Sequence, residues 1–89
     1  MFCVYILFSQ SANRYYIGQT ENLDDRMHRH NSGFEHSTKS FLPWQLVCKI
    51  EKKTRSEAII LERKIKNLNT EDLKKFIGKY ETKSGGREA

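Results

Sequence analysis

The sequence predicts an α+β fold in which three helices flank a small three-stranded antiparallel sheet, in the order β-β-α-β-α-α. Three short runs that are apolar or rich in aromatic and β-branched residues are typical of strands, and they occupy residues 2–8, 14–18 and 45–51. Three other segments carry apolar residues at helical spacing, at about residues 23–31, 55–68 and 70–78. The chain has 89 residues, which is enough for one domain with a modest core.

The first two strands are expected to form a hairpin around the polar segment 9–13. Residues 2–8 are apolar at every position, as in a strand covered on both faces, so this strand is expected at the centre of the sheet. If residues whose numbers sum to 21 pair across the turn, Tyr5 lies directly opposite Tyr16 on one face, and Tyr15 points to the core on the other. We expect a turn centred one residue away to move Tyr5 and Tyr16 to opposite faces.

A helix is expected to follow the second strand, which breaks at Gly18. Asn22 is the expected N-cap, and two aspartates come next, where the positive end of the helix dipole favours acidic residues. The helix is expected to end near Asn31, because a Ser-Gly pair follows. Arg26 and His30 are four residues apart and therefore share one helical face.

The third strand is expected after a polar loop at residues 34–42 and the pair Pro43-Trp44. Within 45–51, apolar residues alternate with mostly polar ones, which is typical of a half-exposed strand. The apolar face of this strand is expected to hold Leu46, Cys48 and Ile50.

The second helix begins with a capping-box pattern, because Glu57 comes three residues after Thr54. Its inward stripe is expected to consist of Ala58, Leu61, Ile65 and Leu68. At 100° per residue, Glu62 falls at the edge of this stripe rather than on the solvent side. A carboxylate held against a core is costly without a cationic partner, so Glu62 is a candidate functional residue.

Either Asn69 or Thr70 is expected to cap the last helix, and Gly78 to end it. The apolar face of this helix is expected to hold Leu73, Phe76 and Ile77. Residues 81–89 contain two glycines and almost no apolar side chain, so they are expected to form a disordered tail after a domain at 1–80.

The composition limits the class of partner and the compartment. Sixteen Lys and Arg against eleven Asp and Glu give a formal net charge of +5, which favours a polyanionic partner, although ordinary surface solubility explains it as well. No apolar run has the length of a membrane helix, and residues 2–8 lack the basic leader and cleavage site of a signal peptide. Cys3 and Cys48 have no metal-like spacing and are expected as buried reduced thiols in a cytoplasmic protein.

Two triplets in the first hairpin, Val4-Tyr5-Ile6 and Tyr16-Ile17-Gly18, are followed by Arg26, and this arrangement resembles the GIY-YIG nuclease superfamily. The resemblance covers about residues 2–68 and includes Asn31-Ser32-Gly33, Pro43-Trp44, Leu46-Val47, Ser56-Glu57-Ala58 and Glu62-Arg63-Lys64-Ile65-Lys66. The sequence is most similar to small single-domain bacterial members related to the N-terminal nuclease domain found in the bacterial excinuclease. The first triplet departs from the family pattern in carrying its tyrosine at the centre.

The resemblance implies that Glu62 holds one divalent metal ion. A single carboxylate, completed by waters and a substrate phosphate, suits Mg²⁺, with Mn²⁺ as a possible substitute. The alternative for Glu62 is an ion pair with Lys66, four residues later. Arg26 is implied to clamp the phosphate, because its planar fork matches phosphate oxygens; its alternative is a surface ion pair with Glu21, Asp24 or Asp25.

The resemblance also assigns roles to both motif tyrosines. We expect Tyr5 to act as general base and Tyr16 to orient the substrate and contact its phosphate; the alternative is that both are amphipathic strand residues with satisfied hydroxyls. Gly18 leaves room for a phosphate or for the approaching helix. His30 either assists proton transfer or contacts phosphate, or is a half-exposed polar residue.

Relatives present a polar loop near the site, and the matching positions here include Thr38 and Lys39 as candidate substrate-binding residues. The combined prediction is a metal-dependent endonuclease that hydrolyses DNA, with RNA as another possible substrate. Repair or recombination is the role that relatives imply, and a homodimer or a protein partner is expected to supply specificity. The alternatives are a non-catalytic nucleic-acid-binding module that keeps the fold, and a structural or protein-interaction module.

Overall fold

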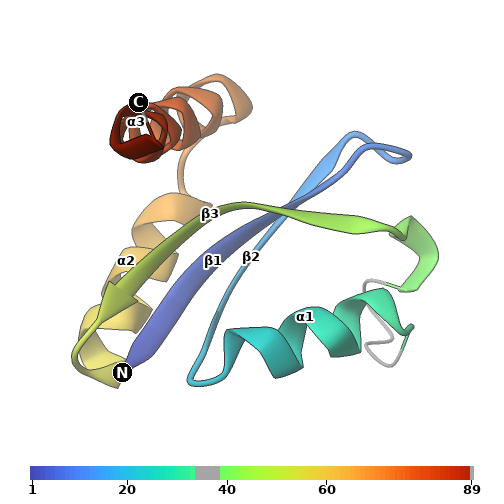
Figure 1. Cartoon of the computed structure of the whole chain (residues 1–89), viewed down its shortest axis with the longest axis horizontal. Coiled ribbons are helices and arrows are strands. Elements are labelled where there is room, and N and C mark those ends of the chain that lie inside the picture. The colour runs from blue at the N-terminus through green and yellow to red at the C-terminus, as the bar shows by residue number, and fades with distance from the viewer. Residues whose placement is uncertain (34–38, 89) are drawn as a thin grey trace.

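A computed structural model describes residues 1–33 and 39–88, with side chains of the last helix described as far as Tyr80. The elements along these residues are β1 (Phe2–Ser9), β2 (Arg14–Thr20), α1 (Leu23–Asn31), the 3-10 helix η1 (Lys39–Phe41), β3 (Trp44–Lys52), α2 (Arg55–Lys66) and α3 (Thr70–Glu88). The predicted α+β class and its β-β-α-β-α-α order are confirmed (Figure 1). The short helix η1 lies inside the segment that was expected to be a loop throughout.

The sheet is antiparallel with the strand order β2-β1-β3, so β1 is central as predicted. The predicted hairpin register is wrong: Tyr5 pairs with Gly18 and Tyr16 pairs with Leu7, so paired numbers sum to 23. The turn is therefore centred one residue later, and it includes Asn13 at a φ of 53°. The two tyrosines nevertheless share a face, because moving the turn centre by one residue moves each partner by two positions, which is one full period of the strand. The expectation that such a shift separates them is also wrong.

Successive side chains of β1 alternate between two separate hydrophobic cores, one on each face of the sheet. Val4 and Ile6 belong to one core, which α2 and α3 complete with Ala58, Ile65, Leu73 and Ile77. Tyr5 and Leu7 belong to the other, together with Cys3 and Trp44, and side chains of α1 and η1 pack against it. Figure 1 shows α1 and α3 on opposite sides of the sheet. This arrangement explains why β1 is apolar at every position.

A β-bulge in β3 changes which face its side chains occupy. Ile6 pairs with Cys48, whereas the next residue, Leu7, pairs with Leu46, which leaves Val47 as an extra residue. The extra residue moves Leu46 to the core of α1, while Cys48 stays in the core of α2 and α3 with Ile50 packed against it. The prediction that these three apolar residues share one face is therefore wrong for Leu46.

The predicted helix starts are confirmed by their caps. The Asn22 side chain accepts a hydrogen bond from the Asp25 backbone N–H at 3.0 Å. Thr54 and Glu57 form the expected capping box at the start of α2. Gly33 follows α1 with a φ of +80°, a conformation that glycine adopts without steric cost.

The end of α1 at Asn31 is as predicted, whereas the ends of α2 and α3 differ from the prediction. α2 ends at Lys66, two residues early, although Leu68 still packs against the core. Asn69 caps α3 by accepting from the Asp72 N–H at 2.8 Å. The expected end at Gly78 is wrong, because α3 continues to Glu88 and covers most of the segment expected as a disordered tail; a single glycine costs a helix only about 1 kcal/mol. The domain boundary at residue 80 stays a prediction.

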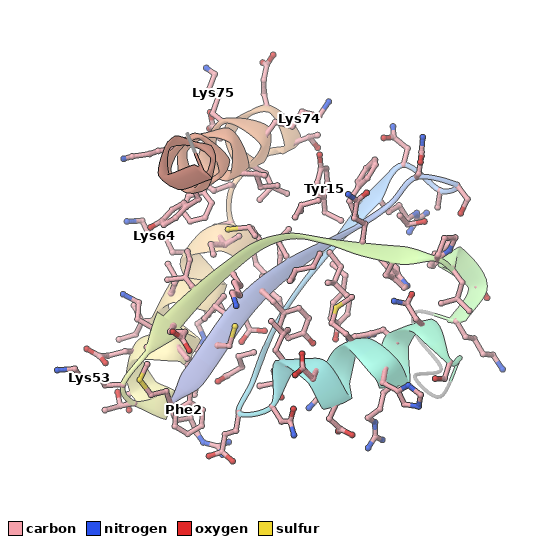
Figure 2. The ribbon with its side chains drawn as sticks, in the orientation of Figure 1. Phe2, Tyr15, Lys53, Lys64, Lys74 and Lys75 are labelled. Carbon is pink, nitrogen blue, oxygen red and sulfur yellow. The ribbon has the colours of Figure 1, made fainter. Side chains whose placement is uncertain are left out.

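Lys74 and Lys75 are exposed on α3, on the side of the helix that the sequence pattern assigned to solvent. Figure 2 shows Lys74 and Lys75 projecting away from the sheet. Among the described helices, none combines the length and the apolar character that crossing a bilayer requires.

Candidate active site

Tyr5 lies at the centre of the candidate site, where β1 passes beneath α1. Its side chain is 1% exposed, and its hydroxyl lies 3.1 Å from Nε2 of His30. Gly18 faces Tyr5 across the hairpin, and a Cβ built there would lie 2.7 Å from the Tyr5 hydroxyl oxygen. Gly18 therefore makes room for the Tyr5 hydroxyl, and its role in substrate binding stays a prediction.

His30 is completely buried, at 0% exposure. The ring of Tyr16 meets the His30 ring edge-on, with centroids 4.9 Å apart, and lies 6.2 Å from the ring of Tyr5. The alternative of a half-exposed His30 is therefore wrong: this imidazole is packed between the motif tyrosines, and α1 presents it inward. Tyr16 is only partly buried, so it is the phenol of the pair with solvent access.

Arg26 lies one helical turn before His30 on α1 and is partly buried. It lines a pocket of about 380 Å³ together with residues of the β2–α1 connection and with Arg55 at the start of α2. Gln19, which directly follows Gly18 in β2, lines the same pocket. The guanidinium side chain therefore lines a polar cavity and lies one helical turn from His30 along α1.

Glu62 approaches β2 from the α2 side. Its side chain is 17% exposed and pairs with Lys66 at 3.0 Å, so the ion pair considered from the sequence is present. Gln19 Nε2 donates to Glu62 Oε1 at 3.4 Å. Because side chains alternate along a strand, Gln19 faces α2 while its neighbour Gly18 faces the tyrosines. Glu62 is thus connected to the pocket of Arg26 through Gln19, whereas Tyr5, Tyr16 and His30 contact one another directly.

The side chains near the pocket fit a metal site that has a single carboxylate ligand. Within the part of the chain that the structure describes, no group of three or more His, Cys, Asp or Glu side chains is arranged to hold a metal ion. Magnesium does not require such a cage, because it keeps several waters and binds through one or two carboxylates plus substrate phosphate. Glu62 therefore fits as a single carboxylate ligand, in competition with the Lys66 ammonium.

The sequence reasoning missed the residues that hold this site in place. Asn31, the last residue of α1, donates to the Trp44 carbonyl at 3.2 Å and accepts from the Trp44 N–H at 2.8 Å. This pair of bonds ties the end of α1, next to His30, to the start of β3. Gln19 was missed too, because the second strand was expected to break at Gly18, whereas β2 continues to Thr20.

The two loop residues that were predicted to bind substrate, Thr38 and Lys39, stay predictions. Thr38 lies outside the described residues. Lys39 is exposed at the start of η1, and its role in substrate binding stays a prediction.

The cysteines do not supply a nucleophile. Both are free and buried, as predicted. Burial raises the pKa of the Cys48 thiol to about 11 and also raises that of Cys3, where Lys49 opposes the effect. Both thiols are therefore protonated near neutral pH, and a protonated thiol is a poor nucleophile.

Comparison with known proteins gives one family and one solved structure. The family model described as the GIY-YIG catalytic domain matches residues 1–76, a range that includes all of the candidate site residues. The solution NMR structure of the UPF0213 protein BH0048 from Bacillus halodurans is similar, with a TM-score of 0.58 and 28% sequence identity. The alignment covers 88% of this chain and 84% of that one. No curated protein matches the sequence.

Proposed function

Since the chain belongs to the GIY-YIG family, a family of nuclease-type domains whose model spans residues 1–76, we propose that it is an endonuclease that hydrolyses DNA phosphodiester bonds with a divalent metal ion. The observation that carries this proposal is the contact of 3.1 Å between the Tyr5 hydroxyl and His30 Nε2 in a buried cluster. Ordinary strand tyrosines would need only a satisfied hydroxyl, whereas hydrolysis needs a group that can take a proton from water.

Tyr5 and His30 form a proton relay in this proposal. With Nε2 unprotonated, the imidazole accepts the hydroxyl proton of Tyr5, and the resulting phenolate takes a proton from the attacking water. The His30 imidazole is 0% exposed and its Nε2 lies 3.1 Å from the Tyr5 hydroxyl, so the hydroxyl proton has an acceptor within hydrogen-bond distance. Tyr16, packed edge-on against the same imidazole, has the solvent access needed to contact the phosphate.

In this proposal the positive charge of Arg26 binds the phosphate and the negative charge of Glu62 binds the metal ion. The Arg26 guanidinium binds phosphate oxygens in a bidentate manner and stabilises the charge that develops on them. Glu62 holds the metal ion, with magnesium or manganese as the expected species. When bound, such an ion neutralises phosphoryl oxygens and acidifies a coordinated water. Gln19 steadies the Glu62 carboxylate through its hydrogen bond of 3.4 Å.

The proposal is tested by nicking of supercoiled plasmid in Mg²⁺ or Mn²⁺. We expect Tyr5→Phe, Arg26→Ala and Glu62→Gln each to lower the rate by ~10²-fold or more, since each removes a group that this proposal assigns to the attacking water, the reacting phosphate or the metal ion. The matched controls are Arg29→Ala, an exposed arginine on the same helix, and Glu71→Gln, an exposed carboxylate on α3; neither should change the rate. Equal nicking by the wild type and all variants would identify a contaminating nuclease.

A second candidate function is non-catalytic nucleic-acid binding. It is favoured by the net charge of +5 and by the Lys66 ammonium that already pairs with Glu62. Binding without cleavage, with a steep salt dependence, would support it. A duplex RNA of the same sequence in both assays separates DNA from RNA as substrate. By analogy with excinuclease relatives, we propose repair or recombination of DNA in the cytoplasm as the setting, with a homodimer or a protein partner supplying specificity.

A further inference from the structure

We propose that Arg55 forms a second phosphate-binding site, which holds a backbone phosphate of the same nucleic-acid strand next to the phosphate bound by Arg26. Arg55 opens α2 and was not among the candidate residues of the sequence. The inference rests on the proposed function for its nucleic-acid ligand, and it adds a contact that positions the strand.

The first observation is the shared pocket. Arg26 and Arg55 come from the first turns of two different helices and line one cavity of about 380 Å³. Three uncharged polar residues line the same cavity, namely Gln19, Thr20 and Asn22. Guanidinium groups and short polar side chains are the groups that contact phosphate oxygens in protein–DNA interfaces.

The second observation is that Arg55 is held in place. Its Cζ atom lies over the Phe2 ring, 5.2 Å from the ring centroid, so a cation–π contact joins two residues that line the pocket. The planar fork of an arginine is preorganised, so it loses less side-chain freedom for each hydrogen bond to a phosphate than a lysine does. Figure 2 shows Phe2 and Lys53 at the same end of the sheet, so a further cation lies next to this part of the surface.

One acidic residue works against the site. Glu21 also lines the pocket, so the lining carries two cations and one anion. The net charge of the lining still favours a phosphate, and Glu21 is expected to weaken its binding. This gives the proposal a test in the opposite direction, because removing the Glu21 charge should strengthen binding.

The test measures binding of a labelled DNA duplex of about 20 base pairs by fluorescence anisotropy, in EDTA so that no cleavage occurs. Arg55→Ala is expected to weaken binding about eightfold at about 0.1 M salt and to lower the salt slope by about 0.9, which is the loss of one phosphate contact. Arg55→Lys should restore part of the affinity and Glu21→Gln should increase it. The matched controls remove the same charges elsewhere: Arg63→Ala on the exposed side of α2, and Glu71→Gln on α3.

Equal weakening by Arg55→Ala and Arg63→Ala would overturn the inference, because the effect would then be one of net charge. The nicking assay keeps the two proposals apart. If Glu62→Gln abolishes nicking while Arg55→Ala binds like the wild type, the proposed function stands and the Arg55 site is refuted. If the wild type never nicks with either metal but Arg55→Ala alone loses affinity, the Arg55 site stands and the proposed enzyme is refuted. Failure of the folded wild type to bind DNA or RNA would refute both.

Discussion

Replacing Gly18 with alanine tests the packing on which the candidate site depends. The new Cβ would lie 2.7 Å from the Tyr5 hydroxyl oxygen, 2.8 Å from Tyr5 Cζ and 3.2 Å from Tyr16 Cε1. Carbon atoms pack at about 3.5–4.0 Å, so the Tyr5 ring has to move by roughly 0.5–1 Å. That ring is 1% exposed and bonded to His30, so it has no open space to enter.

The magnitude follows from two terms. Overpacking a filled core costs roughly 1–3 kcal/mol. Displacing the Tyr5 hydroxyl from His30 adds the loss of one hydrogen bond, about 1 kcal/mol. The expected destabilisation of Gly18→Ala is therefore about 2–4 kcal/mol, which lowers Tm by roughly 10–20 °C in a domain of this size.

The assay is thermal and urea unfolding followed by circular dichroism. Gly78→Ala is the matched control, because nothing lies within 4 Å of a Cβ at Gly78 and the residue is helical; this variant should gain about 0.5–1 kcal/mol. A double-mutant cycle with Tyr5→Leu identifies the cause, since leucine lacks both Tyr5 atoms nearest to the new methyl group. If Gly18→Ala destabilises the Tyr5→Leu background as much as the wild type, the contact with Tyr5 is not the reason and the packing argument is refuted.

Three further predictions concern the support of the site, its metal ligand and the core. Asn31→Ala should lower the free energy of unfolding, measured in urea, by about 1–3 kcal/mol, because two hydrogen bonds between Asn31 and the Trp44 backbone are lost; an unchanged midpoint would contradict this. Lys66→Ala should tighten Mn²⁺ binding measured by EPR, because the ammonium 3.0 Å from Glu62 no longer competes for the carboxylate; weaker binding would argue against Glu62 as the ligand. Burial raises the pKa of the Cys48 thiol from 9.0 to about 11, so the folded protein holds this proton more tightly than the unfolded chain does. The contribution of the protonated thiol to folding stability is therefore complete below pH 9 and is lost as the pH rises to 11. Between pH 8 and about pH 10.5, the free energy of unfolding of the wild type should fall by about 2 kcal/mol more than that of Cys48→Val. Equal falls in the two proteins would refute the assignment of this pH dependence to Cys48.

The hairpin shows which features of a strand pair can be predicted from the alternation of side chains and which cannot. The sequence pattern placed Tyr5 and Tyr16 on one face, and their rings lie 6.2 Å apart there. The pairing itself was predicted two positions off, since Tyr5 faces Gly18 and not Tyr16. Alternation has a period of two residues, so it determines the face of a side chain but not its partner. The partner depends on the conformation of the turn, which contains Asn13 at a positive φ.

Side-chain burial at the ends of elements was harder to predict. His30 stands in the last turn of α1, where a polar residue is ordinarily exposed, and yet it is completely buried between two phenol rings. The helix lies close enough for this because Asn31 bonds to both backbone groups of Trp44. That contact joins residues thirteen positions apart, so it cannot be predicted from the local periodicity of the sequence.

By itself, the sequence determined the order of the three strands and three α-helices, the N-caps of α1 and α2, the centre of the sheet and the shared face of Tyr5 and Tyr16. Only the tertiary structure decided the hairpin register, the bulge that turns Leu46 to the other face, the burial of His30 and the Gln19 bridge to Glu62. The physical reason is the range of the interactions. Periodicity and capping arise between residues within about four positions of one another, whereas register, burial and the bridge depend on how separate elements pack together in space.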